Sequence, residues 1–115
     1  MSNTIDETRL GKGGVKMLNR DNQKMGSELL DEYGPWSQLM MVIEECSELQ
    51  KECCKIFRNR QLGDAFGPSL EIVEELVDVI VMCEQLRLMC GLTSEQINEL
   101  AAEKLKRAIR KTKGM

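Results

Sequence analysis

Residues 70–90 read LEIVEELVDVIVMCEQLRLMC, and this stretch decides the fold. Its apolar residues recur at steps of three and four, which is the spacing of an α-helix. The β-branched run 77–81, taken alone, is typical of a strand, but the helical spacing continues on both of its sides. We therefore predict a helix over about residues 68–90, ended by Gly91. Apolar residues cover most of its circumference, so its own chain or another subunit should surround it.

The same kind of spacing predicts three further helices. The longest begins at Gly34-Pro35, with proline at the first helical position, and runs to about Arg58. A shorter helix precedes it over residues 21–33, with Asp21 as the N-cap. The last helix covers about residues 93–111 and opens with Thr93 and Gln96 at the spacing of a capping box.

The predicted fold is therefore all-α, a helical bundle of about four helices. Residues 21–115 form one domain, and the polar, glycine-dotted residues 1–20 form a flexible arm before it. The apolar surface of the helix over residues 68–90 is too large for a monomer. We expect oligomerisation to complete the core, as a homodimer or homotetramer.

Composition excludes several classes of protein. No stretch approaches the roughly 18 uninterrupted apolar residues of a membrane span, and the N-terminus lacks the apolar core of a signal peptide. The five cysteines are odd in number and lie in apolar helical patterns, which indicates a reducing compartment, so we expect a cytoplasmic protein. The net charge of −3 argues against nucleic acid as a partner.

Charge is distributed unevenly along the chain. Residues 44–84 hold ten acidic and four basic residues, whereas residues 101–115 hold six basic residues and one acidic residue. A local acidic cluster together with a local basic cluster suggests a metal ion and a phosphorylated ligand.

Two of the predicted helices carry matched acidic clusters, each within an arc of roughly 100° beside an apolar face. The members are Glu44, Glu45, Glu48 and Glu52 on one helix and Glu71, Glu74, Glu75 and Asp78 on the other. Solvated helix faces explain Glu44, Glu52 and Glu71 equally well. Asp78 lies between two valines, so we expect it to be buried, and a buried carboxylate requires a compensating partner. Carboxylates in a chain without histidine favour Mg²⁺, with Mn²⁺ as the alternative, over zinc.

The order of these acids resembles a known family. Glu45-Cys46-Ser47-Glu48, followed by Glu75-Leu76-Val77-Asp78, is similar to the ExxE…ExxD signature of the MazG-like all-α nucleoside triphosphate pyrophosphohydrolases. The doubled acids before each motif and the later lysine and arginine, Lys104 and Arg107, strengthen the resemblance, which covers about residues 34–111.

The resemblance implies a reaction and a site. The enzyme would cleave ribo- or deoxyribonucleoside triphosphates to a nucleoside monophosphate and pyrophosphate. Glu45, Glu48, Glu75 and Asp78 would be the catalytic carboxylates that hold Mg²⁺, with Glu44 and Glu74 as weaker candidates.

The same resemblance offers candidates for substrate binding. Lys104 and Arg107 would contact the β- and γ-phosphates, although they are equally typical of a basic helix end. The cations Lys51, Lys55 and Arg58 could also reach phosphate, but pairing of Glu48 with Lys51 or Lys55 explains them almost as well. Trp36 could stack on a base, or it could lie in the core or at a subunit contact.

One position departs from the family. Many members have an asparagine two residues before the lysine of the last helix, and this chain has Ala102 there. Two alternatives stay open: a non-catalytic helical oligomer that serves as an interaction module, and a related phosphohydrolase that acts on phosphoribosyl-ATP or an alarmone.

Overall fold

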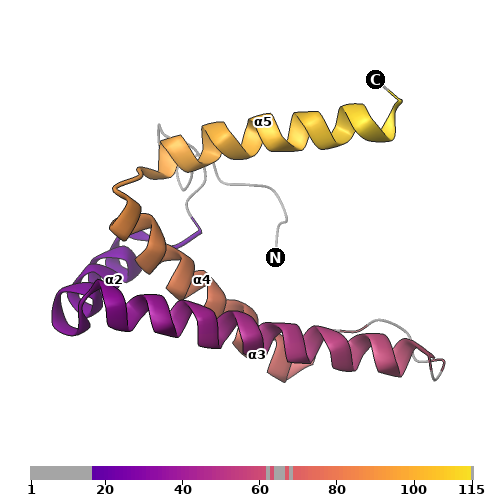
Figure 1. Cartoon of the computed structure of the whole chain (residues 1–115), viewed down its shortest axis with the longest axis horizontal. Coiled ribbons are helices and arrows are strands. Elements are labelled where there is room, and N and C mark those ends of the chain that lie inside the picture. The colour runs from indigo at the N-terminus through magenta and orange to yellow at the C-terminus, as the bar shows by residue number, and fades with distance from the viewer. Residues whose placement is uncertain (1–16, 62, 64–66, 68, 115) are drawn as a thin grey trace, which may run out of the picture. The chain divides into compact units, whose positions relative to one another are not determined.

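The computed structural model describes residues 17–61, 63, 67 and 69–114. Regular structure within these residues is entirely helical, which confirms the all-α prediction (Figure 1). The chain divides into two compact units, Leu18–Cys90 and a second that includes Gly91–Met115. The arm expected over residues 1–20 falls mostly outside the described residues, and a single domain over residues 21–115 stays a prediction.

Four helices occupy the described part of the chain: α2 (Arg20–Tyr33), α3 (Pro35–Gln61), α4 (Leu70–Cys90) and α5 (Ser94–Thr112). Each differs by at most a few residues from its predicted bounds. The β-branched run 77–81 is helical throughout, as its flanking residues predicted.

The starts of α2 and α4 are capped by side chains. Asn19, not the predicted Asp21, is the N-cap of α2, because its Oδ1 accepts a hydrogen bond from the backbone N–H of Asn22 at 2.8 Å. Asp21 lies in the first turn, where its charge favours the helix dipole. At α4 the hydroxyl of Ser69 accepts from the backbone N–H of Ile72 at 3.2 Å.

Glycines with positive φ follow the last residues of α2 and α4. Gly34 joins α2 to α3 with φ 82° and ψ 162°, a backbone region that is essentially restricted to glycine. Pro35 then begins α3, as predicted. Gly91 ends α4 with φ 69°, also as predicted.

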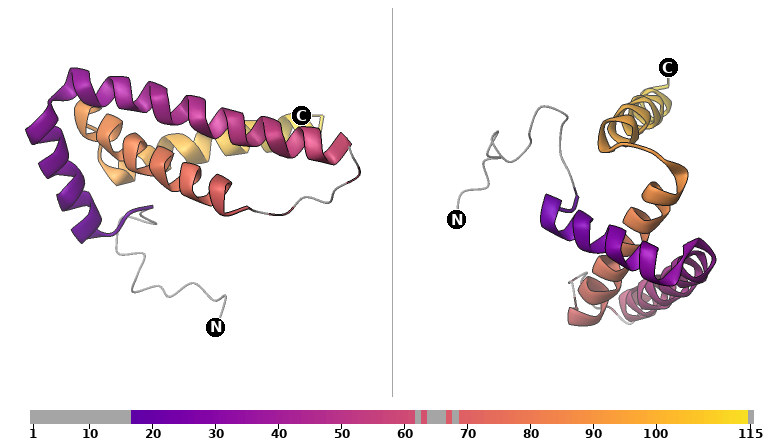
Figure 2. Two further views of the ribbon diagram at one scale, coloured as in Figure 1. Left: turned by 90° about the horizontal axis from the view of Figure 1, so that it is seen from below. Right: turned by 90° about the vertical axis from the view of Figure 1, so that its left-hand side faces the viewer.

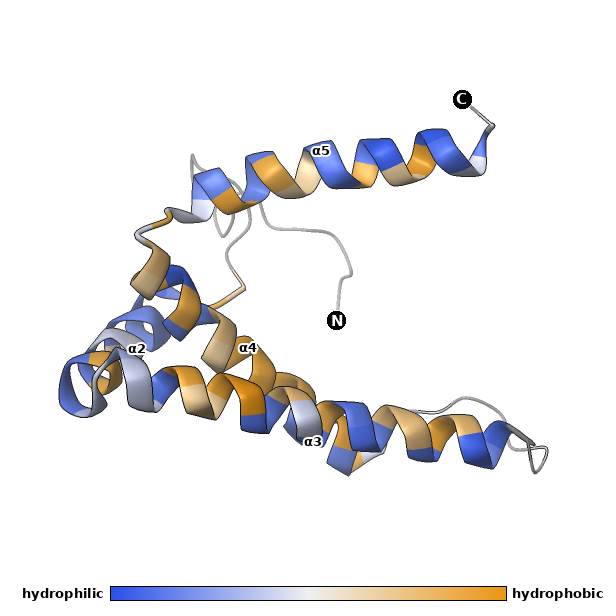
Figure 3. Cartoon of the chain, in the orientation of Figure 1, coloured by the Kyte–Doolittle hydropathy of each residue, from blue (hydrophilic) through white to orange (hydrophobic). Residues whose placement is uncertain are grey.

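In the second unit, α5 is an amphipathic helix whose hydrophilic and hydrophobic residues alternate along its length (Figure 3). It begins with the predicted capping box. The backbone N–H of Gln96 donates to the Thr93 hydroxyl at 3.1 Å, and the backbone N–H of Thr93 donates to the Gln96 side chain at 2.8 Å.

In the first unit, α3 and α4 lie side by side, and α2 packs against both (Figure 2). Among the described residues, Met82 of α4 is the one buried hydrophobic residue, at 6% exposure. Leu70, Val73 and Leu76 are exposed on the same helix. Within the first unit, α2 and α3 therefore do not surround α4, although hydrophobic residues occur along most of its length (Figure 3).

Two further sequence expectations concern the environment of the protein. Within the described residues, no helix combines the length and hydropathy needed to cross a membrane. All five cysteines lie in this part of the chain, and each is free.

Candidate functional site

The site lies between α3 and α4, which run antiparallel. Gln38, near the start of α3, contacts Gln85, near the end of α4, whereas Glu45 lies near Asp78. Moving forward along α3 therefore means moving backward along α4. This antiparallel pairing places the acidic clusters of the two helices opposite each other along the helix axes.

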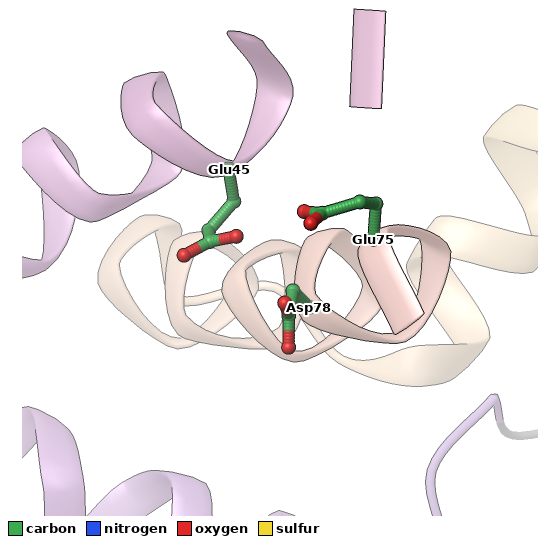
Figure 4. A group of neighbouring side chains, drawn as sticks. All are labelled: Glu45, Glu75 and Asp78. Atoms are coloured by element: carbon green, nitrogen blue, oxygen red, sulfur yellow. The ribbon is translucent and has the colours of Figure 1, made fainter. Parts of the chain in front are cut away.

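Three carboxylates meet at this level. One oxygen each from Glu45 of α3 and from Glu75 and Asp78 of α4 lie within 4.8 Å of one another. Figure 4 shows the Glu45 and Glu75 side chains extending toward each other across the space between the helices. Glu45 and Glu75 are half-buried, and Asp78 is exposed. We call these residues the acidic triad.

The electrostatics of Glu45 reflect this crowding. Its pKa is raised above the ordinary value of 4.5, first by desolvation and then by the negative charges of Asp78 and Glu75. Glu44 and Glu48 raise it further. Each of these influences disfavours the ionised carboxylate, and the positive charge of a bound cation would offset them.

The pKa of Glu75 is also raised above the ordinary value of 4.5. Desolvation raises its pKa first, followed by the charges of Asp78, Glu48, Glu52 and Glu74. Its Oε2 is buried and has no hydrogen-bond partner among the residues that the structure describes. Such an oxygen is costly to leave without a partner, and a cation or an ordered water would satisfy it.

The donor set determines which cation would fit. Three carboxylates offer only hard oxygen ligands, and the chain contains no histidine. Mg²⁺ uses a few carboxylates and completes its shell with water and substrate phosphate, and Mn²⁺ accepts similar ligands. The residues present therefore fit a divalent cation of this class.

The other predicted metal ligands lie beside the acidic triad. Glu48 pairs with Lys51 at 3.8 Å, as the alternative interpretation of Lys51 predicted, and both side chains are mostly exposed. Glu48 nevertheless acts electrostatically on Glu45 and Glu75. Glu44 is exposed, and its negative charge raises the pKa of Glu45 but is not among the causes of the raised pKa of Glu75.

The expected burial of Asp78 is wrong in the isolated chain. Asp78 and its neighbour Val77 are exposed. Valine neighbours are typical of a buried position, but α2 and α3 leave part of the apolar surface of α4 uncovered. Asp78 belongs to the triad as an exposed side chain of α4.

Predicted substrate-binding residues occupy three places. Lys55 pairs with Glu52 at 2.9 Å, and Arg58 is exposed in the last turns of α3. Trp36 is 80% exposed at the start of α3, so it is not a core residue of the first unit. Lys104 and Arg107 belong to α5, in the other unit, and their contact with phosphate stays a prediction.

Sequence reasoning missed a buried polar contact in the same helix pair. Gln38 and Gln85 are 5% and 0% exposed, and Nε2 of Gln38 donates to Oε1 of Gln85 at 3.2 Å. A signal was available: Gln38 precedes Glu45 by seven residues, and Gln85 follows Asp78 by seven. This spacing places each glutamine on the same helix face as a member of the acidic triad.

No protein-family model, curated protein or solved structure matches this chain, so membership of the MazG-like family stays a prediction.

Proposed function

We propose that the protein is a magnesium-dependent nucleoside triphosphate pyrophosphohydrolase. The observation that supports this best is the acidic triad, in which the unpartnered buried Oε2 of Glu75 belongs to a group of carboxylates within 4.8 Å. Glu45, Glu75 and Asp78 are also three of the four acids of the ExxE…ExxD signature.

In this proposal the carboxylates of Glu45, Glu75 and Asp78 hold Mg²⁺, with Glu48 adjacent. When bound, the ion would neutralise charge on the phosphate oxygens and acidify water. Mn²⁺ would serve in the same way.

Glu45 is a candidate for the general base, because a carboxylate can contact the ion through one oxygen and accept a proton at the other. It would accept one proton from the water that attacks the α-phosphorus. The new bond joins the water oxygen to that phosphorus, and the bond to the bridging α–β oxygen breaks. A nucleoside monophosphate and pyrophosphate leave.

Cations would bind the remaining phosphates. Lys104 and Arg107 are stronger candidates than Lys51 and Lys55, because the latter already pair with Glu48 and Glu52 on their own helix. Ala102 stands where many MazG-like members have asparagine, so the phosphate end would differ from theirs.

The proposal includes a second copy of the chain. One buried hydrophobic residue, Met82, is a small core for the described part of a chain of 115 residues. Leu70, Val73, Leu76 and Val77 leave an apolar surface on α4 that a homodimer or homotetramer would cover. Light scattering coupled to size-exclusion chromatography tests this, and a monomer at micromolar concentration contradicts it.

The same apolar surface favours the alternative of a non-catalytic helical oligomer in the cytoplasm. Asp78→Asn separates the two functions, with Glu71→Gln as a matched control that also removes one negative charge from α4. The enzyme predicts that Asp78→Asn loses triphosphate hydrolysis while Glu71→Gln keeps it. Equal hydrolysis by both variants contradicts the metal site. Phosphoribosyl-ATP and an alarmone belong among the substrates tested, because turnover of either alone would favour the related phosphohydrolase.

A further inference from the structure

The buried glutamines form a chain of hydrogen bonds that links three helices. Gln85 of α4 donates from Nε2 to the backbone carbonyl of Gly26 in α2 at 2.6 Å. Its Oε1 accepts from Gln38 of α3 at 3.2 Å. A Cβ at Gly26 would lie 3.1 Å from Nε2 of Gln85, so a larger residue there would require the Gln85 amide to shift.

The direction of each hydrogen bond follows from its partners. A backbone carbonyl can only accept, so Gln85 must turn its Nε2 toward Gly26. The Oε1 of Gln85 is then left for Gln38, which must present a donor. The hydrogen bonds therefore hold each amide group in a single orientation.

This network is aligned with the acidic triad. Gln38 and Glu45 are separated by seven residues on α3, as are Gln85 and Asp78 on α4. Seven residues are nearly two turns, about 10.5 Å along a helix, so the two contacts occupy the same facing stripes. Met82, the buried hydrophobic residue, lies between Asp78 and Gln85 in sequence and on nearly the same face.

A slip between the helices would break both contacts. Displacement by one turn moves α4 about 5.4 Å along α3, which exceeds the 4.8 Å within which the oxygens of the acidic triad lie. The slip would also leave the buried amide of Gln85 without Gln38. An unpaired buried amide is unfavourable, whereas apolar side chains tolerate several registers.

We propose that Gln85, held by Gln38 and Gly26, is a positioning residue for the candidate metal site: it fixes the α3–α4 register that brings Glu45 to Glu75 and Asp78. This inference rests on the proposed function for its metal, but the register itself does not depend on any metal. Gln85 acts through the helices and does not contact the acidic triad.

The test replaces both glutamines, Gln38→Leu with Gln85→Leu, so that neither buried amide is left without the other. Methyl-labelled methionine reports the register, because nuclear Overhauser contacts from the Met82 methyl identify the α3 residues opposite it. Calorimetric titration with Mg²⁺ reports the metal site. Thr93→Ala serves as the control, because it destabilises the start of α5 and leaves both glutamines in place.

We expect the double variant to fold and to bind Mg²⁺ at least tenfold more weakly. Its Met82 methyl should contact α3 residues of more than one register, or α3 residues one turn away from those that it contacts in the wild type. The control should keep the wild-type contacts and affinity. Unchanged Met82 contacts, or unchanged Mg²⁺ affinity despite altered contacts, would overturn the inference. If the wild-type protein binds no Mg²⁺, the proposed function fails, and the Met82 contacts alone decide whether the glutamines set the register.

Discussion

Neutralising one carboxylate of the acidic triad should move stability and activity in opposite directions. Glu45→Gln keeps the shape of the side chain and removes its charge. The pKa of Glu45 is raised because its ionised form is desolvated and lies near the charges of Asp78 and Glu75. The substitution therefore relieves an unfavourable charge in the metal-free protein and removes a ligand and proton acceptor from the proposed enzyme.

The magnitude follows from the distance between charges. Two carboxylate oxygens 4.8 Å apart repel by about 0.9 kcal/mol in water, and salt reduces this, so the pair of Glu45 and Asp78 costs on the order of 0.5–1 kcal/mol. For a chain of this size that corresponds to a rise in melting temperature of roughly 2–5 °C. Hydrolysis of triphosphates should fall about 100-fold or more, by analogy with the effect of disturbing metal shells.

The pH dependence of this stabilisation has a definite sign. Because the folded-state pKa of Glu45 is raised, its protonated form is favoured on folding, and its contribution to stability is fully present below the ordinary value of 4.5. That contribution is lost as the pH rises through the folded pKa. Glu45→Gln should therefore exceed wild type in melting temperature at pH 7 and lose that advantage below pH 4.5.

The assay compares thermal unfolding in EDTA at pH 7 and pH 4 with hydrolysis in Mg²⁺. Glu71→Gln is the control, since it removes a negative charge from α4 outside the acidic triad and should leave both quantities near wild type. A melting temperature lowered by Glu45→Gln at pH 7 would refute the electrostatic reasoning. Full hydrolysis by Glu45→Gln would refute its assigned role.

Three further predictions concern the metal and the helix ends. Mg²⁺ at about 100 times its Kd at pH 7.5 should stabilise the protein by about 2.7 kcal/mol in calorimetry. The same Mg²⁺ concentration should stabilise it less at pH 5, because protons compete with the ion for Glu45, and equal stabilisation at both pH values contradicts the site. Gly34→Ala should cost about 1–3 kcal/mol in urea unfolding, because φ 82° with ψ 162° strains other residues; a neutral result contradicts this. Thr93→Ala should cost about 1 kcal/mol and speed hydrogen exchange of the Gln96 amide, and unchanged exchange contradicts the capping role.

The helices could be predicted because their signals are local. Pro35, Gly91 and the capping box of Thr93 act within a few residues of the chain, so the sequence alone indicates where each helix begins or ends. The N-cap of α2 was misassigned because Asn19 and Asp21 are both good capping residues, and only backbone geometry distinguishes them.

The site could be predicted only in part because its geometry depends on the register between helices. The positions of Glu45, Glu75 and Asp78 on amphipathic helices indicated a shared face, but the sequence does not state which residues stand opposite one another. Glu48 shares that face and pairs instead with Lys51. Periodicity also cannot tell an apolar face that packs within the chain from one left exposed, which is why Asp78 was expected to be buried.

The most direct test of the central claim is to incubate the purified protein with Mg²⁺ and a panel of ribo- and deoxyribonucleoside triphosphates and to identify the released products. We expect a nucleoside monophosphate and pyrophosphate in equal amounts, with release abolished by EDTA. Release of single phosphates, or no turnover of any triphosphate by the folded protein, would contradict it.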